Sequence, residues 1–279
     1  MMEGALRDTI EVLGIVVIVY FVLLNLIYLA FTLLAGQSLS RHMRRHTYEP
    51  TESAMASPLT PPISVLLPAY NEEAGIVTSV HSLLDLRYPL YEVVVIDDGS
   101  KDATVARLHE EFDLVPIRIA MRDSVPHAEV LETMVSKRDP RLVVIRKRNG
   151  GKADALNTGL CAASYPFICS IDADTLIEEE ALLRVAMPII ESPDKVVATG
   201  GIVRIANGCK IEAGRVTEVG LPKSRLATMQ VVEYFRAFLV GRIAWSRLSA
   251  LLIISGAFGL FRRSAVEEVG GWWTETVGE

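Results

Sequence analysis

The chain has 279 residues and a formal net charge of −6 at pH 7. This acidic balance argues against a nucleic-acid partner, which would need a strong local basic patch. Three cysteines (Cys161, Cys169 and Cys209) are too few and too scattered for a disulfide framework or a zinc site. They predict reduced, buried thiols on the cytosolic side of a membrane.

The first predicted element is a transmembrane helix over residues 12–35. As a helix this segment reaches about 36 Å, enough for a hydrocarbon core of about 30 Å. A cleaved signal peptide is the main alternative, but residues 1–11 are acidic rather than basic and no clean cleavage site follows. Arg41, Arg44 and Arg45 come directly after the span and favour the cytoplasm. We therefore expect a single-pass protein of the cell membrane, with everything beyond residue 40 in the cytoplasm.

Residues 36–62 predict a basic and then Pro/Ser-rich linker, and residues 63–279 one α/β domain. In the domain, short β-branched runs alternate with helical patterns. Strands are predicted at 63–68, 92–97, 142–147 and 167–172, and helices near 73–86, 102–112, from 151 onward and near 178–191. This alternation implies a mostly parallel sheet with helices on both faces. The irregular stretch 113–141 delays the third strand and is interpreted as an insertion.

Polar residues follow the first two predicted strands. The first ends in PAYNEE, where Tyr70 can stack on a base and Glu72 can form hydrogen bonds, although Asn71 could equally be a helix cap. The second ends in DDGS. Asp97 and Asp98 are costly to bury unless a ligand or backbone donors meet them, while Gly99 permits a tight turn. Ser100 can cap the next helix, and the alternatives for the motif are recognition of the base and ribose of a nucleotide, or a turn with an acidic cap.

The third strand is followed by RNGGKADALN. Gly150 and Gly151 expose backbone N–H groups and Lys152 adds an ammonium, which suits a diphosphate. A solvated helix terminus is the alternative, and the spacing of the nucleotide-triphosphatase loop is absent. The fourth strand ends in DAD. In an extended backbone Asp172 and Asp174 point the same way and suit a divalent cation, Mg²⁺ or Mn²⁺; an Asx turn is the alternative.

Two apolar regions follow. Residues 229–248 are interrupted by arginines and cannot span a bilayer, so they form either a helix buried under the sheet or an interfacial helix at the cytoplasmic leaflet. Residues 248–261 are short and indicate core, with a strand expected. Trp272 and Trp273 could belong to the core or to a sugar-stacking wall.

These ordered motifs, with SGAFGLFRRSAVEEVGGW and TVGE after them, resemble the family 2 inverting glycosyltransferases. The likeness runs from about residue 63 to 279. Within that family, the motifs more narrowly resemble the processive membrane synthases of cellulose, chitin, hyaluronan and poly-N-acetylglucosamine. The nucleotide-sugar transferase domain of these synthases has the GT-A fold.

The resemblance implies a donor site and an acceptor site. Tyr70 would stack on uracil with Glu72 nearby, Asp97 or Asp98 would hold the uracil and ribose, and Lys152 would neutralise the diphosphate. Asp172 and Asp174 would present ribose and metal contacts. Ser255, Gly256 and Ala257 would line the acceptor terminus. The family's general base would lie beyond Glu279, so no catalytic residue is assigned and the chain itself is expected to be slow or inactive.

The sequence therefore predicts metal-assisted transfer of a sugar from a UDP-sugar to a growing polysaccharide, with inversion. A polyprenyl-phosphate acceptor is an alternative, and so is a non-catalytic nucleotide-sugar-binding or assembly module. A phosphatase of the haloacid-dehalogenase type is disfavoured, because Leu176 stands where its pattern needs threonine.

Overall fold

The computed structural model describes residues 2–46, 55, 57, 59–212 and 215–275. The chain divides into two compact units. The first consists of Met1–Glu49 and Met229–Leu252, and the second of Pro50–Thr228 and Ile253–Glu279.

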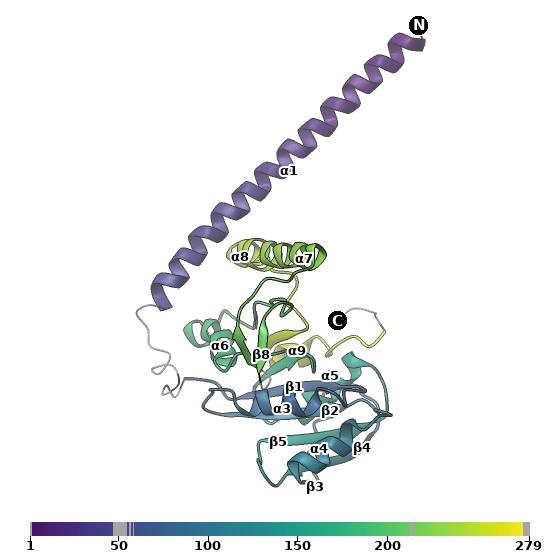
Figure 1. Cartoon of the computed structure of the whole chain (residues 1–279), viewed down its shortest axis with the longest axis vertical. Coiled ribbons are helices and arrows are strands. Elements are labelled where there is room, and N and C mark those ends of the chain that lie inside the picture. Colours follow the sequence, from purple (N-terminus) through teal and green to yellow (C-terminus); the bar gives the residue numbers. More distant parts are fainter. Residues whose placement is uncertain (1, 47–54, 56, 58, 213–214, 276–279) are drawn as a thin grey trace. The chain divides into compact units, whose positions relative to one another are not determined.

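The first unit is built on a single long helix, α1 (Met2–His46), which includes the predicted span (Figure 1). Its segment Asp8–Arg41 contains an 18-residue window with a mean hydropathy of 2.8, and it is the one stretch of the described residues that is long and apolar enough to cross a membrane. The predicted linker was wrong over residues 36–46, which continue α1. The sequence offers no proline there before Pro50, and the arginines near the carboxyl end of α1 suit the helix dipole. Residues 47–54 of that linker lie outside the described residues.

A second helical segment runs through α7 (Arg225–Phe235), the π-helix η1 (Arg236–Arg242) and α8 (Ile243–Arg247). From Met229 onward it belongs to the first unit and packs on α1. The Trp245 and Phe31 rings lie 4.9 Å apart, and the Arg236 guanidinium lies 5.9 Å from the Tyr28 ring centroid. No residue of α7 is buried. Within the first unit, the packing partner of this segment is α1.

The second unit holds an eight-stranded sheet with the order β3-β4-β5-β2-β1-β6-β10-β7. The strands are β1 (Ile63–Ala69), β2 (Tyr91–Asp97), β3 (Leu114–Pro116), β4 (Val130–Ser136), β5 (Leu142–Lys147), β6 (Phe167–Ile171), β7 (Ala198–Gly200) and β10 (Phe258–Arg262). The four central strands β5, β2, β1 and β6 are parallel, as predicted. The outer strands pair antiparallel, so the sheet is mixed. In Figure 1, β3, β4 and β5 lie at the bottom of the view, with β2 and β1 above them.

The interpretation of residues 113–141 as irregular was wrong, because the stretch contains β3 and β4. These strands extend the sheet beyond β5. They escaped prediction because β3 has only 3 residues and β4 is mostly half-buried without a clear alternation. Only 258–261 of the second apolar region forms a strand. Leu251, Leu252 and Ile253 are exposed, so the expectation of core was wrong for the first part of that region.

Helices cover both faces of the sheet. They are α3 (Ile76–Leu84), α4 (Thr104–Phe112), α5 (Lys152–Ala162), α6 (Ala181–Glu191) and α9 (Arg263–Glu268). Alternate strand residues point to opposite faces. One face, with Val65 and Leu67, packs against α3, α4 and α6; the other, with Leu66, packs against α5 and α9. A separate two-stranded sheet is formed by β8 (Lys210–Glu212) and β9 (Arg215–Glu218).

The cysteines are unpaired. Cys161 and Cys169 are buried, as predicted, whereas Cys209 is only half-buried.

Candidate donor site at the strand ends

The carboxyl ends of the four parallel strands meet at one edge of the sheet. Ala69 at the end of β1 is in register with Asp97 of β2, and Asp97 with Arg146 of β5. The polar residues that follow β1, β2, β5 and β6 therefore lie along the same edge, where α/β sheets bind their ligands.

The loops after β1 and β2 are tied together by hydrogen bonds. Asn71 Oδ1 accepts from the N–H of Lys101 at 2.8 Å, and the N–H of Asn71 donates to Ser100 Oγ at 2.9 Å. The N–H of Glu72 donates to Thr104 Oγ1 at 2.9 Å. Neither Asn71 nor Ser100 caps a helix, because α3 and α4 have no side-chain cap. The alternative of helix caps is therefore wrong for these two residues, whose side chains hold one loop against the other. Tyr70 remains exposed beside them.

Asp98 is enclosed by donors from the protein itself. Its Oδ1 accepts the N–H of Gly150 at 2.9 Å, and its Oδ2 accepts the N–H of Gly151 at 2.8 Å. The ammonium of Lys147, the last residue of β5, pairs with the same carboxylate and lies 2.6 Å from Asp154 Oδ1. Lys147 is fully buried and Asp98 is 3% exposed. Two acids and one base thus form a closed group under the sheet edge.

This group corrects the prediction for the glycine turn (residues 149–151). The N–H groups of Gly150 and Gly151 donate to Asp98 and do not face outward as free donors for a phosphate. Sequence analysis missed Lys147 and Asp154 altogether. A lysine that ends an apolar run was the available signal for Lys147, because a buried ammonium needs paired carboxylates.

Asp97 differs from its neighbour. It is 1% exposed, and its hydrogen bonds come from Ser100, whose backbone N–H lies 3.3 Å from Oδ1 and whose side chain also bonds the carboxylate. Arg146 Nε lies 4.0 Å from its Oδ2. Burial raises the pKa of Asp97, and the Ser100 hydrogen bonds and Arg146 only partly offset it. The Asp97 carboxylate is therefore less well supplied with donors than that of Asp98.

The remaining predicted donor residues form an open group. Lys152 Nζ, at the start of α5, lies 2.9 Å from Asp172 Oδ1, an ion pair without the angles of a hydrogen bond. Asp174 is exposed. Burial raises the pKa of Glu72, and repulsion from the Asp174 and Asp102 carboxylates raises it further. Glu72, after β1, and Asp174, after β6, are thus near enough to interact.

The extended conformation predicted for the DAD motif is wrong, because the motif forms a turn. Strand β6 ends at Ile171, and the N–H of Thr175 donates to the Asp172 carbonyl at 3.0 Å, which closes a turn. Ala173 is buried, and its carbonyl accepts from Ser79 Oγ at 2.5 Å. The turn brings Asp172 toward Lys152 and leaves Asp174 in solvent. The described residues contain no group of three or more His, Cys, Asp or Glu side chains able to hold a metal ion.

The predicted acceptor residues lie next to the DAD turn. The Ala257 carbonyl accepts from the N–H of Asp172 at 3.4 Å, and Ser255 and Gly256 precede it in the loop before β10. Trp272 packs against the core, and its backbone N–H donates to Asn157 Oδ1 at 2.8 Å. Trp273 is 70% exposed. Trp272 is thus the half-buried one of the two tryptophans, and the TVGE motif lies outside the described residues.

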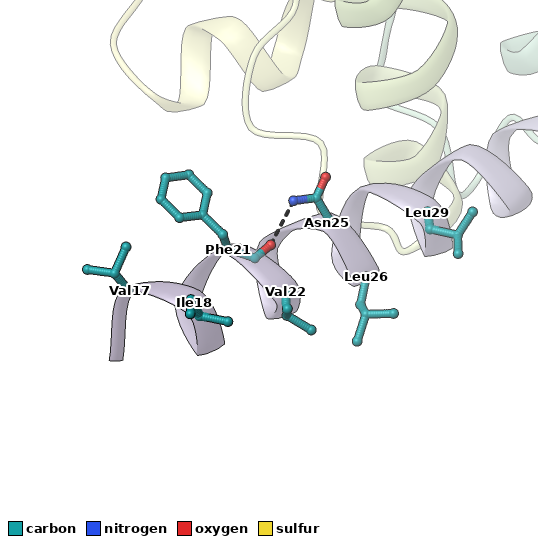
Figure 2. A pocket seen from close by; sticks show the side chains of 7 residues that line it. All are labelled: Val17, Ile18, Phe21, Val22, Asn25, Leu26 and Leu29. Atoms are coloured by element: carbon teal, nitrogen blue, oxygen red, sulfur yellow. Dashed lines mark hydrogen bonds between the residues drawn. The ribbon is translucent and has the colours of Figure 1, made fainter. Parts of the chain in front are cut away.

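A hollow on α1 is unrelated to these residues (Figure 2). It is lined by Val17, Ile18, Phe21, Val22, Asn25, Leu26 and Leu29. Asn25 Nδ2 donates to the Phe21 carbonyl at 2.7 Å, so the polar side chain is satisfied within the helix. The lining is otherwise apolar, as expected of a helix surface that faces lipid.

The second unit is an α/β domain with charged loops at the carboxyl ends of parallel strands, the edge where such sheets bind ligands. The family model described as glycosyl transferase family 2 matches residues 64–270. The chain belongs to this family of glycosyltransferases, which rules out the phosphatase alternative.

Two curated relatives are poly-β-1,6-N-acetyl-D-glucosamine synthases. The one from Staphylococcus epidermidis strain RP62A is 32% identical over 219 residues, and the one from Staphylococcus aureus strain COL is 30% identical over the same length. Each match covers 78% of this chain and 43% of the relative. The chain thus spans less than half the length of the relatives it matches.

A solved structure with a similar fold is a mannosyltransferase from Pyrobaculum calidifontis, determined in complex with GDP-Man and Mn²⁺. It is 21% identical, with a TM-score of 0.54, and the match covers 89% of this chain and 59% of that one. The fold of the second unit is therefore that of a known nucleotide-sugar transferase.

Proposed function

We propose that the chain transfers a sugar from a UDP-sugar to a growing polysaccharide, with inversion and with help from Mg²⁺ or Mn²⁺. The observation that carries the proposal is the open group of Lys152, Asp172, Asp174 and Glu72, which lies beside the Ala257 loop at the sheet edge. The relatives' name points to UDP-N-acetylglucosamine as the donor to test first.

The nucleoside would bind over the loops after β1 and β2. Tyr70 is 44% exposed and offers a ring for stacking on the base. Asp97 lacks the two backbone N–H groups and the ammonium that bind Asp98, so an N–H of uracil or a ribose hydroxyl would add to its hydrogen bonds from Ser100 once its buried carboxylate is uncovered. We assign this role to Asp97 and not to Asp98, whose oxygens are already taken.

The diphosphate would bind over Lys152 and the DAD turn. Asp174 and Asp172 supply the hard oxygen ligands that Mg²⁺ and Mn²⁺ prefer, and a cation held by two carboxylates completes its shell with water and phosphate oxygens. When bound, the cation would neutralise charge on the departing diphosphate. Lys152 would do the same through its ammonium, and it would be released from Asp172 once the cation takes that carboxylate.

The acceptor would approach through the loop that carries Ser255, Gly256 and Ala257. This loop touches Asp172 through the Ala257 carbonyl, so an acceptor there is next to the sugar of a donor bound on the DAD turn. Transfer with inversion then requires a carboxylate to take the proton of the acceptor hydroxyl.

We also propose that α1 anchors the chain in the cell membrane with the second unit in the cytoplasm. The arginines after the span support this orientation. The segment Met229–Leu252 would lie in the cytoplasmic leaflet, because it packs on α1 and exposes both apolar and arginine side chains.

Cysteine labelling tests this topology. Single cysteines at Gly4 and Glu110 are introduced into a chain without its three native cysteines, and an impermeant thiol reagent is added to intact cells. Position 4 should be labelled and position 110 only after lysis. Labelling of position 110 in intact cells would reverse the orientation.

Donor binding and transfer are measured on the full chain in lipid nanodiscs. Titrations with UDP and GDP in Mn²⁺ should show tighter binding of UDP. Incorporation from UDP-N-acetylglucosamine, UDP-glucose and GDP-mannose identifies the sugar, and solvent partition of the product separates polymer from a polyprenyl lipid. Binding of UDP with no transfer from any donor would favour a binding module, and tighter binding of GDP would reject the uridine assignment.

A further inference from the structure

We infer that Lys147 is a positioning residue, which with Asp98 and Asp154 fixes the glycine turn and so sets Lys152 beside Asp172. The inference rests on the proposed function, in which Lys152 meets the donor diphosphate.

The ammonium of Lys147 has all three of its hydrogens engaged. It pairs with Asp98 and with Asp154 Oδ1, the latter at 2.6 Å, and donates to the Arg148 carbonyl at 2.7 Å. An ammonium has three donors and no acceptor, so none is left for a ligand. Because Lys147 is fully buried, it also cannot reach one. Any effect of Lys147 on the donor must therefore pass through its neighbours.

Asp98 passes that effect to the glycine turn. Its two oxygens each accept one backbone N–H, from Gly150 and from Gly151, which fixes both peptide planes. Gly151 has a φ of +90°, and a Cβ on Gly150 would meet Asp154 Cγ at 2.6 Å. This tight, left-handed turn is the last structure before Lys152, so its peptide planes decide the direction in which α5 begins.

Asp154 connects the same group to the loop before β4. Its two oxygens accept the N–H of Ala128 at 3.1 and 3.0 Å, in the long connection between β3 and β4. The loop that delayed the third predicted strand thus helps to hold the start of α5. Lys147, Asp98 and Asp154 together join β2, β5, α5 and this loop.

A buried set of charges is a poor choice if stability alone is needed, because apolar residues of similar volume often stabilise as well or better. What the charges add here is direction: each carboxylate oxygen faces a particular N–H or ammonium. The ordered result is a Lys152 ammonium 2.9 Å from Asp172.

The test compares the binding of UDP with that of uridine, in Mn²⁺, for the full chain in nanodiscs. The dissociation constant for uridine divided by that for UDP measures the contribution of the diphosphate to binding. Lys152→Met should reduce this ratio about tenfold, since it removes a charge-assisted contact. Lys147→Met and Asp154→Asn should reduce it to a similar degree while uridine affinity stays the same. Lys137→Met, on an exposed lysine, is the matched control and should change neither constant.

A double mutant separates positioning from a general loss of structure. Asp154→Asn in the Lys152→Met background should lower the ratio no further, because both act on one contact. If Lys147→Met does not fold, Asp154→Asn decides, since its amide oxygen can still accept from Ala128. If the folded Lys147→Met and Asp154→Asn variants keep the wild-type ratio of dissociation constants, the inference is overturned and the proposed function is not affected. A wild-type chain that binds UDP no better than uridine overturns the proposed function with it.

Discussion

Two pairs of acidic residues follow apolar strands in this chain, and the structure treats them in opposite ways. Asp98, after β2, receives two backbone N–H groups and the Lys147 ammonium and is 3% exposed. Asp174, after β6, is exposed, and its charge adds to burial in raising the pKa of Glu72. The first carboxylate is satisfied within the protein, whereas the second is left for water or a ligand.

The difference separates the polar residues at the sheet edge into those that fix the structure and those that can bind a ligand. A carboxylate whose oxygens are filled by its own chain fixes geometry, and removing its partners costs stability. An exposed carboxylate that repels its neighbour costs stability by itself, and a bound cation relieves it. The two groups therefore predict different responses to the same kind of substitution.

The largest expected effect is on the closed group. Lys147→Met leaves two carboxylates buried without their cation, and breaking a buried ion pair in this way costs about 3–5 kcal/mol. Lys137→Met removes a lysine that is exposed and 3.9 Å from Asp113, a surface pair worth about 0–1 kcal/mol. Urea unfolding of both variants in detergent, followed by tryptophan fluorescence, measures the difference. If both variants lost the same free energy of unfolding, the buried group would contribute no more to stability than the exposed ion pair.

The next effect concerns the open group. Asp174→Asn should stabilise the metal-free protein only slightly, because solvent screens the repulsion that it relieves, and should weaken Mn²⁺-dependent binding of UDP by about 1–3 kcal/mol, since one charged ligand is lost. Asp113→Asn, also on an exposed aspartate, is the control. Titrations at several Mn²⁺ concentrations give the metal dependence. A mutant with the wild-type metal dependence would reject Asp174 as a ligand.

A similar loss is expected at the nucleoside end. Tyr70→Ala should weaken UDP binding by about 1–3 kcal/mol, the value of stacking one base on an aromatic side chain, with no change in metal dependence. Tyr70→Phe keeps the ring and should bind UDP nearly as well as wild type. If alanine were tolerated as well as phenylalanine, the ring would have no part in recognition.

The sequence predicted the centre of the fold better than its edges. The four parallel strands were readable because they are apolar on both faces, whereas β3 and β4 carry short or partly exposed runs. The segment after Met229 was ambiguous because its packing partner, α1, lies some two hundred residues earlier in the chain. Periodicity says that such a helix has an apolar side but not what covers it.

The site was predicted by residue type and not by partner. Tyr70, Lys152, Asp172 and Asp174 lie at the sheet edge, but nothing in DDGS or DAD says that Asp98 meets Lys147 while Asp174 meets solvent. That assignment depends on the chain path after β5, where the glycine turn brings two N–H groups back to Asp98. Spacing along the sequence does not contain this contact, and the turn after β6 is equally invisible there.

The smallest effect tests the repulsion within the open group. The pKa of Glu72 is raised above its ordinary value of 4.5, first by burial and then by the Asp174 and Asp102 carboxylates. Because the folded-state pKa is the higher one, the contribution of Glu72 to stability is complete below the unfolded-state pKa and is lost as the pH rises through the raised value. At neutral pH an ionised Glu72 therefore opposes folding, and Glu72→Gln should stabilise the metal-free protein by no more than about 0.5 kcal/mol, since solvent screens the charge.

Melting curves of wild type and Glu72→Gln without metal should separate at pH 7 and coincide below the ordinary pKa. Mn²⁺ bound at Asp174 offsets the repulsion, so it should raise the melting temperature of wild type more than that of the variant. Glu110→Gln, on the exposed side of α4, should shift neither curve. Melting curves of Glu72→Gln that followed wild type at every pH would show that Glu72 and Asp174 act independently.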